Sequence, residues 1–318
     1  MSWNPTASLA AARQRAAATA AIRTYFAARE VLEVQTPALG ATTVTDPNIE
    51  SLQVNAPLIG RAFYLQTSPE YAMKRLLAAG YPDIYQIATV YRDGEIGHRH
   101  QPEFTLLEWY RHGFDLAAII ADTLALLTAL LSLPGSAITL TAKPDSGRWD
   151  DLLAGALGVT SDSPTAALQE HVDSEFPPAL RGDHDALCDW LFDQHVARHF
   201  APDRLSVVSH YPASQAALAE LDPASNKALR FEVYCGALEL ANGFVELTDA
   251  HEQRERFAED LAKRRARAAH APPVDEAFLA ALTAGLPQCA GVAVGLERVL
   301  MLIGGQQDIR NVISFAQD

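Results

Sequence analysis

The chain has 318 residues, nearly half of them hydrophobic, with 39 acidic residues against 25 basic ones and a formal net charge of −14. This length accommodates one large domain or two ordinary ones. The acidity argues against a general binder of nucleic acid, because phosphate binding depends on Lys and Arg displacing counterions. The simplest explanation of the net negative charge is solubility.

Cysteine spacing and apolar segments predict a cytoplasmic protein. Cys188, Cys235 and Cys289 stand far apart, which argues against a disulfide framework or a zinc cage and favours a reducing compartment. The first residues lack the features of a secretory signal. The longest apolar stretch, Leu116–Leu133, contains Asp122, which would cost about 2.5–3.5 kcal/mol at the centre of a bilayer. We therefore expect a buried or amphipathic helix there and no membrane association.

The N-terminal segment predicts a helix followed by a short strand. Ser8–Arg29 is rich in alanine and spaces Ile22 and Phe26 at a helical interval. Val31–Pro37 is a β-rich run that ends at a proline.

A second strand and helix follow. Phe63 begins a strand, and Ser68 is expected to cap the next helix, with Pro69 at the first helical position and Glu70 in the first turn. The helix is expected to stop at Gly80.

The middle of the chain predicts a hairpin and then a mainly helical region. Ile84–Arg92 and Glu103–Arg111 are two β-rich runs joined by the polar loop Asp93–Pro102, which is typical of an antiparallel hairpin. Residues from about 115 to 205 are helical in pattern, with breaks near 145 and 161. We interpret them as an insertion between the two halves of one sheet.

The β pattern returns in Ser206–Tyr211 and Phe231–Glu239. A charged helix is expected over His251–Ala269, and a final strand and helix begin at Cys289. Strands beside strands and helices in blocks indicate the α+β class, with an antiparallel sheet flanked by helices. Without repeats or a low-complexity linker, we expect residues 1–318 to form one domain.

Two C-terminal segments carry the strongest chemical signal. Glu239 and Glu246 lie seven residues apart around an expected kink at Asn242-Gly243, and their oxygens would suit a hard divalent cation such as magnesium. Gly291–Arg298 is a small-residue strand that ends in a glycine turn and delivers one arginine. Magnesium and a fixed guanidinium suit the triphosphate of ATP.

Further cations lie at the predicted hairpin. Arg92 is at the end of its first strand, and Arg99 and His100 are in its loop. Such groups suit phosphates, although any one of them taken alone would more often form a surface ion pair. The chain has no Gly-x-x-x-x-Gly-Lys loop, so ATP would be held in another way.

Acidic and aromatic residues predict a substrate with two amines. Glu70, Glu108, Tyr110 and Glu246 could receive ammonium groups, and Trp109 or Phe244 could supply an apolar wall. The alternative is that Glu108, Trp109 and Tyr110 only end a half-buried strand.

Together these segments resemble the class II aminoacyl-tRNA synthetases. Arg92–Tyr110 is similar to the second signature of that family in its lysyl form, Gly291–Arg298 to the third, and Phe26–Pro37 to the first, which builds a dimer interface. Glu239–Asp249 is similar to the metal- and ATP-binding strand of the lysyl enzymes. The resemblance covers nearly the whole chain and is weakest across the inserted region.

Within this family the chain resembles the short paralogues of lysyl-tRNA synthetase. The first signature begins almost at once, without the N-terminal anticodon-binding barrel, and Ala293 stands where the lysyl enzymes have glycine. These paralogues attach (R)-β-lysine to a lysine of elongation factor P, so the resemblance implies that factor as acceptor and makes tRNA an unlikely one. It also implies ATP, magnesium and a homodimer.

The resemblance implies roles for individual residues. For a lysine or β-lysine substrate, the implied contacts are Ser68, Pro69 and Glu70 at the backbone-side amine, Glu108, Tyr110 and Glu246 at the distal ammonium, and Ala293 beside the backbone. For ATP they are Arg92, Asp93, Gly94, Arg99, His100, Gln101, Glu239, Leu240, Gly295 and Arg298. Arg92 and Arg298 are the implied catalytic groups, and Glu239 and Glu246 the implied magnesium ligands.

The chain departs from the family pattern in places. Asp93-Gly94 replaces an Asn-Glu pair, so the glutamate expected at adenine is missing or displaced to Glu95. Gln101 replaces an asparagine near ATP. Glu30 stands where glycine is usual, which is awkward if the turn needs a positive φ.

The sequence leaves open three alternatives to an enzyme that attaches β-lysine to elongation factor P. They are a compact lysyl-tRNA synthetase that charges tRNA, a catalytically silent regulatory paralogue, and an amidase or synthetase that uses a small amine. His195 and His199 are spaced like zinc ligands, and Lys263–Arg267 is a short basic run, but we expect both to be solvated helix faces.

Overall fold

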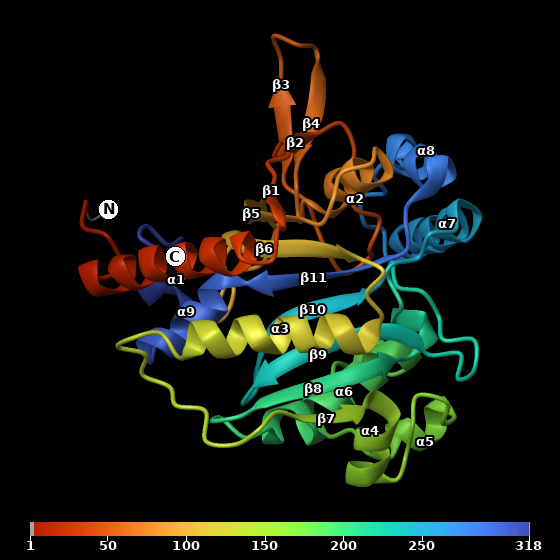
Figure 1. The fold of residues 1–318 in the computed structure, drawn as a ribbon. Helices are drawn as coiled ribbons and strands as arrows, with labels where there is room; N and C mark the ends of the chain where they lie inside the picture. The colour runs from red at the N-terminus through yellow and green to blue at the C-terminus, as the bar shows by residue number, and fades with distance from the viewer. Residues whose placement is uncertain (1–2, 318) are drawn as a thin grey trace.

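The computed structural model describes residues 3–317 and centres on one large sheet (Figure 1). Eight strands form it, in the order β1 (Leu32–Glu33), β5 (Ile84–Tyr91), β6 (Glu103–His112), β11 (Cys289–Gly295), β10 (Leu238–Val245), β9 (Ala228–Cys235), β8 (Leu205–Tyr211) and β7 (Asp145–Arg148). The six strands from β5 to β8 pair antiparallel, whereas β1 and β7 join the two edges in parallel. The predicted α+β class and the β5–β6 hairpin are confirmed, and the parallel edges are an addition.

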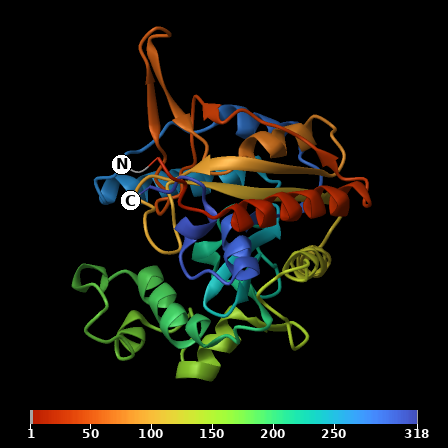
Figure 2. The same cartoon turned by 90° about the vertical axis from the view of Figure 1, so that its left-hand side faces the viewer.

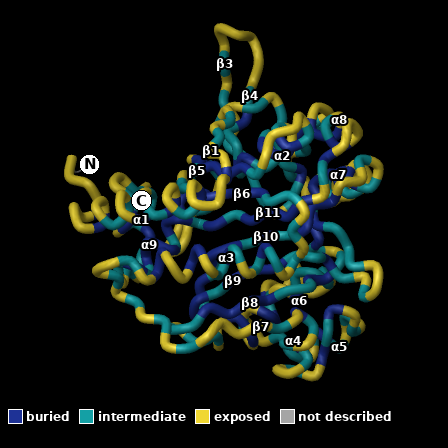
Figure 3. The backbone as a smooth tube through the Cα atoms, in the orientation of Figure 1, coloured by how far each residue is buried: buried dark blue, intermediate teal, exposed yellow. Residues whose placement is uncertain are grey.

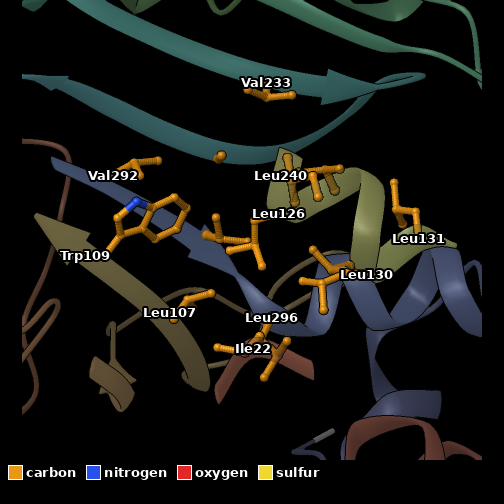
Figure 4. Packing of buried hydrophobic residues seen from close by; sticks show 14 of the residues in the cluster. Ile22, Leu107, Trp109, Leu126, Leu130, Leu131, Val233, Leu240, Val292 and Leu296 are labelled. Carbon is orange, nitrogen blue, oxygen red and sulfur yellow. The ribbon is translucent and has the colours of Figure 1, made fainter. Parts of the chain in front are cut away.

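Helices α1 (Leu9–Ala27), α3 (Leu116–Leu131) and α9 (Leu296–Gly304) pack beside the sheet and enclose the main core. The side chains of β6 alternate: Leu107 and Trp109 enter this core, while Glu108 and Tyr110 face a cavity on the other side. Figure 4 shows Trp109 and Leu107 packed near Leu126 of α3. The sheet therefore has one dry face and one face available for chemistry.

Helices α2 (Glu70–Ala78), α7 (Ala250–Ala266) and α8 (Glu276–Gly285) form a second layer around Met73, Phe257 and Phe278. Beside them lies a small sheet of β2 (Leu39–Gly40), β4 (Arg61–Leu65) and β3 (Gln53–Ala56). The β3–β4 hairpin projects away from the body of the molecule (Figures 1 and 2), and its tip is exposed (Figure 3).

The predicted insertion contains two kinds of structure. Its first helix, α3, belongs to the main core. Helices α4 (Trp149–Leu157), α5 (Thr165–Gln169) and α6 (His184–His195) pack instead around Trp149, Leu187 and Phe192, against β8. The separately packed part of this region thus begins at Trp149. In the described part of the chain, no helix has the length and apolarity to span a bilayer.

Three local predictions are corrected by the structure. The predicted strand Phe231–Glu239 is two strands, because the chain turns between β9 and β10 at Gly236, whose φ is +56°. Asn242-Gly243 is not a kink but lies within regular β10 pairing. A Cβ at Gly243 would approach the carbonyl oxygen of Gly291 to 2.7 Å, so the glycine permits close strand packing.

The third correction concerns the start of α2. Pro69 occupies the cap position and not the first helical position, although the Oγ of Ser68 still accepts a hydrogen bond of 3.1 Å from the Glu70 N–H. The expectation at Glu30 holds, because its φ is +57° and the turn after α1 requires the left-handed conformation.

Candidate active site

A cavity of about 820 Å³ opens on the polar face of the sheet. Most predicted site residues line it: Ser68, Glu70, Arg92, Arg99, His100, Gln101, Glu108, Tyr110, Glu239, Leu240, Glu246, Ala293, Gly295 and Arg298. The fold brings them together because β6, β10 and β11 are adjacent and present alternate residues to the same face.

One end of the cavity is lined by carboxylates. Glu108 accepts hydrogen bonds from the Oγ of Ser68, at 2.7 Å, and from the Oη of Tyr110, at 2.6 Å. Burial raises the pKa of Glu108 to about 7, and the nearby Glu70 carboxylate contributes to the shift. The Oε1 of Glu246 is buried and has no hydrogen-bond partner among the described residues. This end is suited to receive cations.

Lys74 is a member of this end that the sequence analysis missed. It follows Glu70 by four residues on α2, is 1% exposed, and forms ion pairs with Glu70, at 2.7 Å, and with Glu246. Burial raises the pKa of Glu246 even though the Lys74 ammonium opposes the shift. The four-residue spacing of Glu70 and Lys74 was the available signal, but only the fold brings Glu246 to the same ammonium.

The other end of the cavity is lined by guanidinium groups. Arg298, in the first turn of α9, donates through Nη1 to the backbone oxygen of Glu239 at 3.0 Å and to its Oε2 at 3.1 Å. Its Nη2 lies 2.9 Å from Nε2 of His100. Burial and the Arg298 charge lower the pKa of His100, so the neutral imidazole can accept this hydrogen bond.

Arg92 lies directly after β5. Its Nη1 is 3.4 Å from the Oε1 of Glu95, and its guanidinium lies 5.1 Å from the centre of the Phe104 ring. The Nε is buried without a hydrogen-bond partner in the part of the chain that the structure describes. A buried donor of this kind at the cavity wall suits an anionic ligand. Arg99 also lines the cavity, but its Nη1 donates to the Ala237 carbonyl at 2.8 Å.

Four predicted contacts are placed differently. Pro69, Asp93 and Gly94 do not line the cavity. Gly94 has a φ of +77°, so its glycine serves the turn of the hairpin loop. Gln101 reaches the cavity, but its amide group is paired with the backbone of Gln317 through both its oxygen and its nitrogen.

Strand geometry argues against the prediction that Glu239 and Glu246 hold one cation. They flank opposite ends of β10, and seven residues of extended strand separate them by about 20 Å, whereas magnesium binds its ligands at about 2 Å. Glu232 on β9 was missed and is the better partner for Glu239. Glu239 pairs with Tyr234, so Glu232 is its diagonal neighbour, and both line the cavity.

The charge environment supports this reassignment. Burial and the Glu239 carboxylate both raise the pKa of Glu232, although Arg230 donates to it at 2.5 Å. Two carboxylates are a usual protein contribution to a magnesium site in which substrate phosphates and water complete the shell. Within residues 3–317, no cluster of three or more His, Cys, Asp or Glu side chains could hold a metal.

The remaining sequence signals have structural explanations. His195 and His199 are both exposed, as expected. The basic run is only partly a solvated face, because Arg264 is buried against the loop at residues 45–50. The three cysteines, namely Cys188, Cys235 and Cys289, are free and buried.

A largely antiparallel sheet with a cavity between carboxylates and guanidiniums is the arrangement of a class II synthetase. The family model for class II tRNA synthetases (D, K and N) matches residues 4–318, and the chain belongs to this family. Over 323 residues it is 42% identical to the elongation factor P–(R)-β-lysine ligase of Klebsiella pneumoniae, covering 99% of this chain and 98% of that protein.

Two further relatives carry the same name. The protein of Pectobacterium carotovorum is 42% identical over 320 residues, and that of Photorhabdus laumondii is 40% identical over 319 residues. In both comparisons the match covers 99% of this chain and 97% of the relative.

Proposed function

We propose that this ATP-dependent ligase activates (R)-β-lysine, or lysine, as an acyl-adenylate and transfers it to a lysine ε-amine of elongation factor P. The observation that carries the proposal is the two-ended cavity, with Glu70, Glu108 and Glu246 at one end and Arg92 and Arg298 near the other. The relatives' shared name supports the choice of substrate and acceptor.

The substrate would lie with its ammonium groups among the carboxylates. Tyr110 and Ser68 hold Glu108 through hydrogen bonds, which fixes the position of one ammonium acceptor. Ala293 pairs with Glu108 across β11 and β6 and lines the cavity, so its methyl group limits the space beside the substrate backbone. The substrate carboxylate would then point toward the guanidinium end.

Activation requires no nucleophile from the protein. The substrate carboxylate attacks the α-phosphate of ATP in line, the bond to the β-phosphate breaks, and pyrophosphate leaves. Arg92 and Arg298 would stabilise the charge that develops on the phosphates. In the second step the neutral ε-amine of the acceptor attacks the acyl carbon, AMP leaves, and the amine releases a proton as the amide forms.

Glu239 and Glu232 would hold a magnesium ion when ATP is present, because their carboxylates share one wall and the Glu239 carboxylate raises the pKa of Glu232. Such an ion supplies charge neutralisation to the triphosphate. Arg298 forms an ion pair with Glu239 at the same wall.

The assignment of this metal site predicts the effect of Glu232→Gln. Removal of one carboxylate should raise the magnesium concentration needed for half-maximal activation by roughly tenfold or more. ATP–pyrophosphate exchange measured across a magnesium titration gives this value, and Glu259→Gln on the exposed side of α7 is the matched control. An unchanged magnesium requirement in Glu232→Gln would place the ion elsewhere.

Gly291 provides a test of the ammonium end. A Cβ added to Gly291 would overlap a ring carbon of Tyr110 and lie 2.6 Å from Oε1 of Glu246. Because one methyl group in a shaped pocket changes discrimination about 10- to 200-fold, Gly291→Ala should raise the KM for the amino acid by a factor in that range. The control is Gly155→Ala, where a Cβ meets open space. An unchanged KM would place the substrate elsewhere.

The pH dependence of substrate binding follows from Glu108. This carboxyl must be ionised to pair with an ammonium group, and burial raises its pKa to about 7. The KM for the amino acid should therefore fall as the pH rises from 6 to 8, by up to about tenfold per unit below pH 7 and less above it. Exchange rates across this range measure the effect, and a flat KM would contradict it.

The function itself is tested by ATP–pyrophosphate exchange with lysine and (R)-β-lysine, followed by transfer of labelled amino acid. We expect stimulation by at least one of them and label on elongation factor P. Label on tRNA would favour a compact lysyl-tRNA synthetase, and label on a small amine an amidase-like enzyme. The absence of both exchange and transfer would favour a catalytically silent regulatory paralogue.

Homodimerisation stays a proposal based on the first signature, which here comprises the end of α1 and β1. Light scattering at micromolar concentration would measure the mass, and a monomer would contradict it.

A further inference from the structure

Lys74 is buried at the point where the carboxylates of the ammonium end meet. Its ammonium lies between Glu70 and Glu246, and it is 5.3 and 5.9 Å from the ring centres of Phe244 and Phe278. In the described part of the chain, the ion pairs of Glu70 and Glu246 are both with Lys74, and Glu108 forms none. One cation therefore serves a cluster of three buried or half-buried carboxylates.

Net stability does not explain a buried lysine here. Desolvation of an ammonium and a carboxylate commonly offsets their attraction, and an apolar side chain of similar volume often stabilises a fold as well or better. The neighbouring Phe244 and Phe278 would accept such a side chain. Lys74 provides what an apolar side chain would not, namely a charge and hydrogen bonds that reach Glu70 and Glu246.

We propose that Lys74 is a positioning residue that acts as a built-in counter-ion. It holds Glu70 and Glu246 on either side of one ammonium and sets the fully ionised pocket to a net charge of −2, which matches a substrate with two ammonium groups. The inference rests on the proposed function because it assigns the ammonium end to a diamino acid, and it adds a residue that does not itself line the cavity.

Lys74 is needed to balance the charge of the occupied pocket. With three ionised carboxylates and no cation, two substrate ammonium groups would leave one buried negative charge uncompensated, which is costly. Before a substrate binds, mutual repulsion of the three carboxylates would also keep a proton on one of them. That carboxyl would then be a poorer partner for an ammonium, and binding would have to expel the proton. With Lys74 in place, the bound state is neutral and all three carboxylates can accept.

Lys74→Met is the test, because methionine keeps most of the volume and removes the charge. In ATP–pyrophosphate exchange at pH 7.5 we expect the KM for the amino acid to rise tenfold or more, with kcat within about threefold of the parent and an unchanged KM for ATP. The effect should fall on KM because the ammonium contacts are the same in the ground state and in the transition state.

The number of protons released on binding distinguishes an effect of the Lys74 charge from an effect of its packing. Calorimetry with 1,5-diaminopentane, in buffers of different ionisation enthalpy, measures the protons released when a diamine binds without ATP or acceptor. Lys74→Met should release about one proton more than the parent. The double variant Lys74→Met/Glu246→Gln removes both members of the pair, so its proton release should return to the parental value while its KM stays high.

Two further variants serve as controls for Lys74→Met. Lys143→Met, at an exposed position of the loop after α3, should leave every value unchanged. If Lys74→Met does not fold, the double variant still tests charge balance, since it buries no uncompensated charge. Parental KM and proton release in Lys74→Met, or extra protons from the double variant, would overturn the inference.

These outcomes also separate the inference from the proposed function. If no diamino acid stimulates exchange by the parent, the proposed function fails, while the diamine calorimetry still decides the role of Lys74. If the parent catalyses exchange and Lys74→Met behaves like the parent in both assays, the inference alone fails. Failure of the parent to bind the diamine would overturn both the dication site and the role of Lys74.

Discussion

Replacement of Arg92 with alanine is expected to lower ATP–pyrophosphate exchange by about 10²- to 10³-fold, the usual effect of removing one group that stabilises transition-state charge. Arg92 lines the cavity, and its buried Nε has no hydrogen-bond partner among residues 3–317. Its backbone is held independently of the side chain, since the Arg92 N–H donates to the Pro102 carbonyl at 2.9 Å. The loss should therefore appear in kcat with little change in stability.

Two further variants test whether the guanidinium of Arg92 is required. Arg92→Lys keeps the charge but loses the planar fork that can contact two phosphate oxygens, so partial recovery is expected. Arg198→Ala removes an exposed arginine that pairs with Asp193 and should have no effect. Exchange by Arg92→Ala at more than half of the parental rate would exclude Arg92 from the catalytic machinery.

Arg264→Ala is expected to lower the free energy of unfolding by about 3–5 kcal/mol, because several carbonyl oxygens would each lose a donor at a cost of about 1–3 kcal/mol. Arg264 is 1% exposed, and its guanidinium donates to the carbonyls of Thr45, Asp46, Ile49 and His270 and to Glu50. Alanine would leave these oxygens without their donor and open a cavity beside α7.

Urea denaturation measures this loss, and Arg265→Ala is the matched control because the next residue of α7 is exposed. The loop that Arg264 holds contributes Thr45, Asp46 and Ile49 to the cavity wall. The KM for ATP or for the amino acid should therefore rise as well in Arg264→Ala. A change in stability below about 1 kcal/mol would mean that the loop is held by its other contacts.

The sequence predicted the elements whose signals are local. The β5–β6 hairpin follows from two β-rich runs and a polar loop, and α7 from the charged segment that predicted a helix over His251–Ala269. These patterns depend only on neighbours within a few residues. The expectation that Trp109 supplies an apolar wall of the site is wrong, because side chains alternate along β6: Glu108 and Tyr110 face the cavity, whereas Trp109 lies in the main core.

The errors arose where spacing along the chain was taken as distance in space. Glu239 and Glu246 are close in sequence but lie at opposite ends of β10. Glu232 is equally far from Glu239 in sequence, yet the turn at Gly236 folds β9 back beside β10 and brings the two carboxylates to one wall. Lys74 was missed because its second partner, Glu246, lies 172 positions later, directly after β10.

The sequence by itself determined the fold class, the family signatures and most of the side chains at the cavity, because backbone periodicity and turn chemistry are local properties of the chain. Only the tertiary structure decided which charges share an environment. Electrostatic energy depends on distance and burial, and the pairing of strands β6, β9, β10 and β11 with helices α2 and α9 sets both.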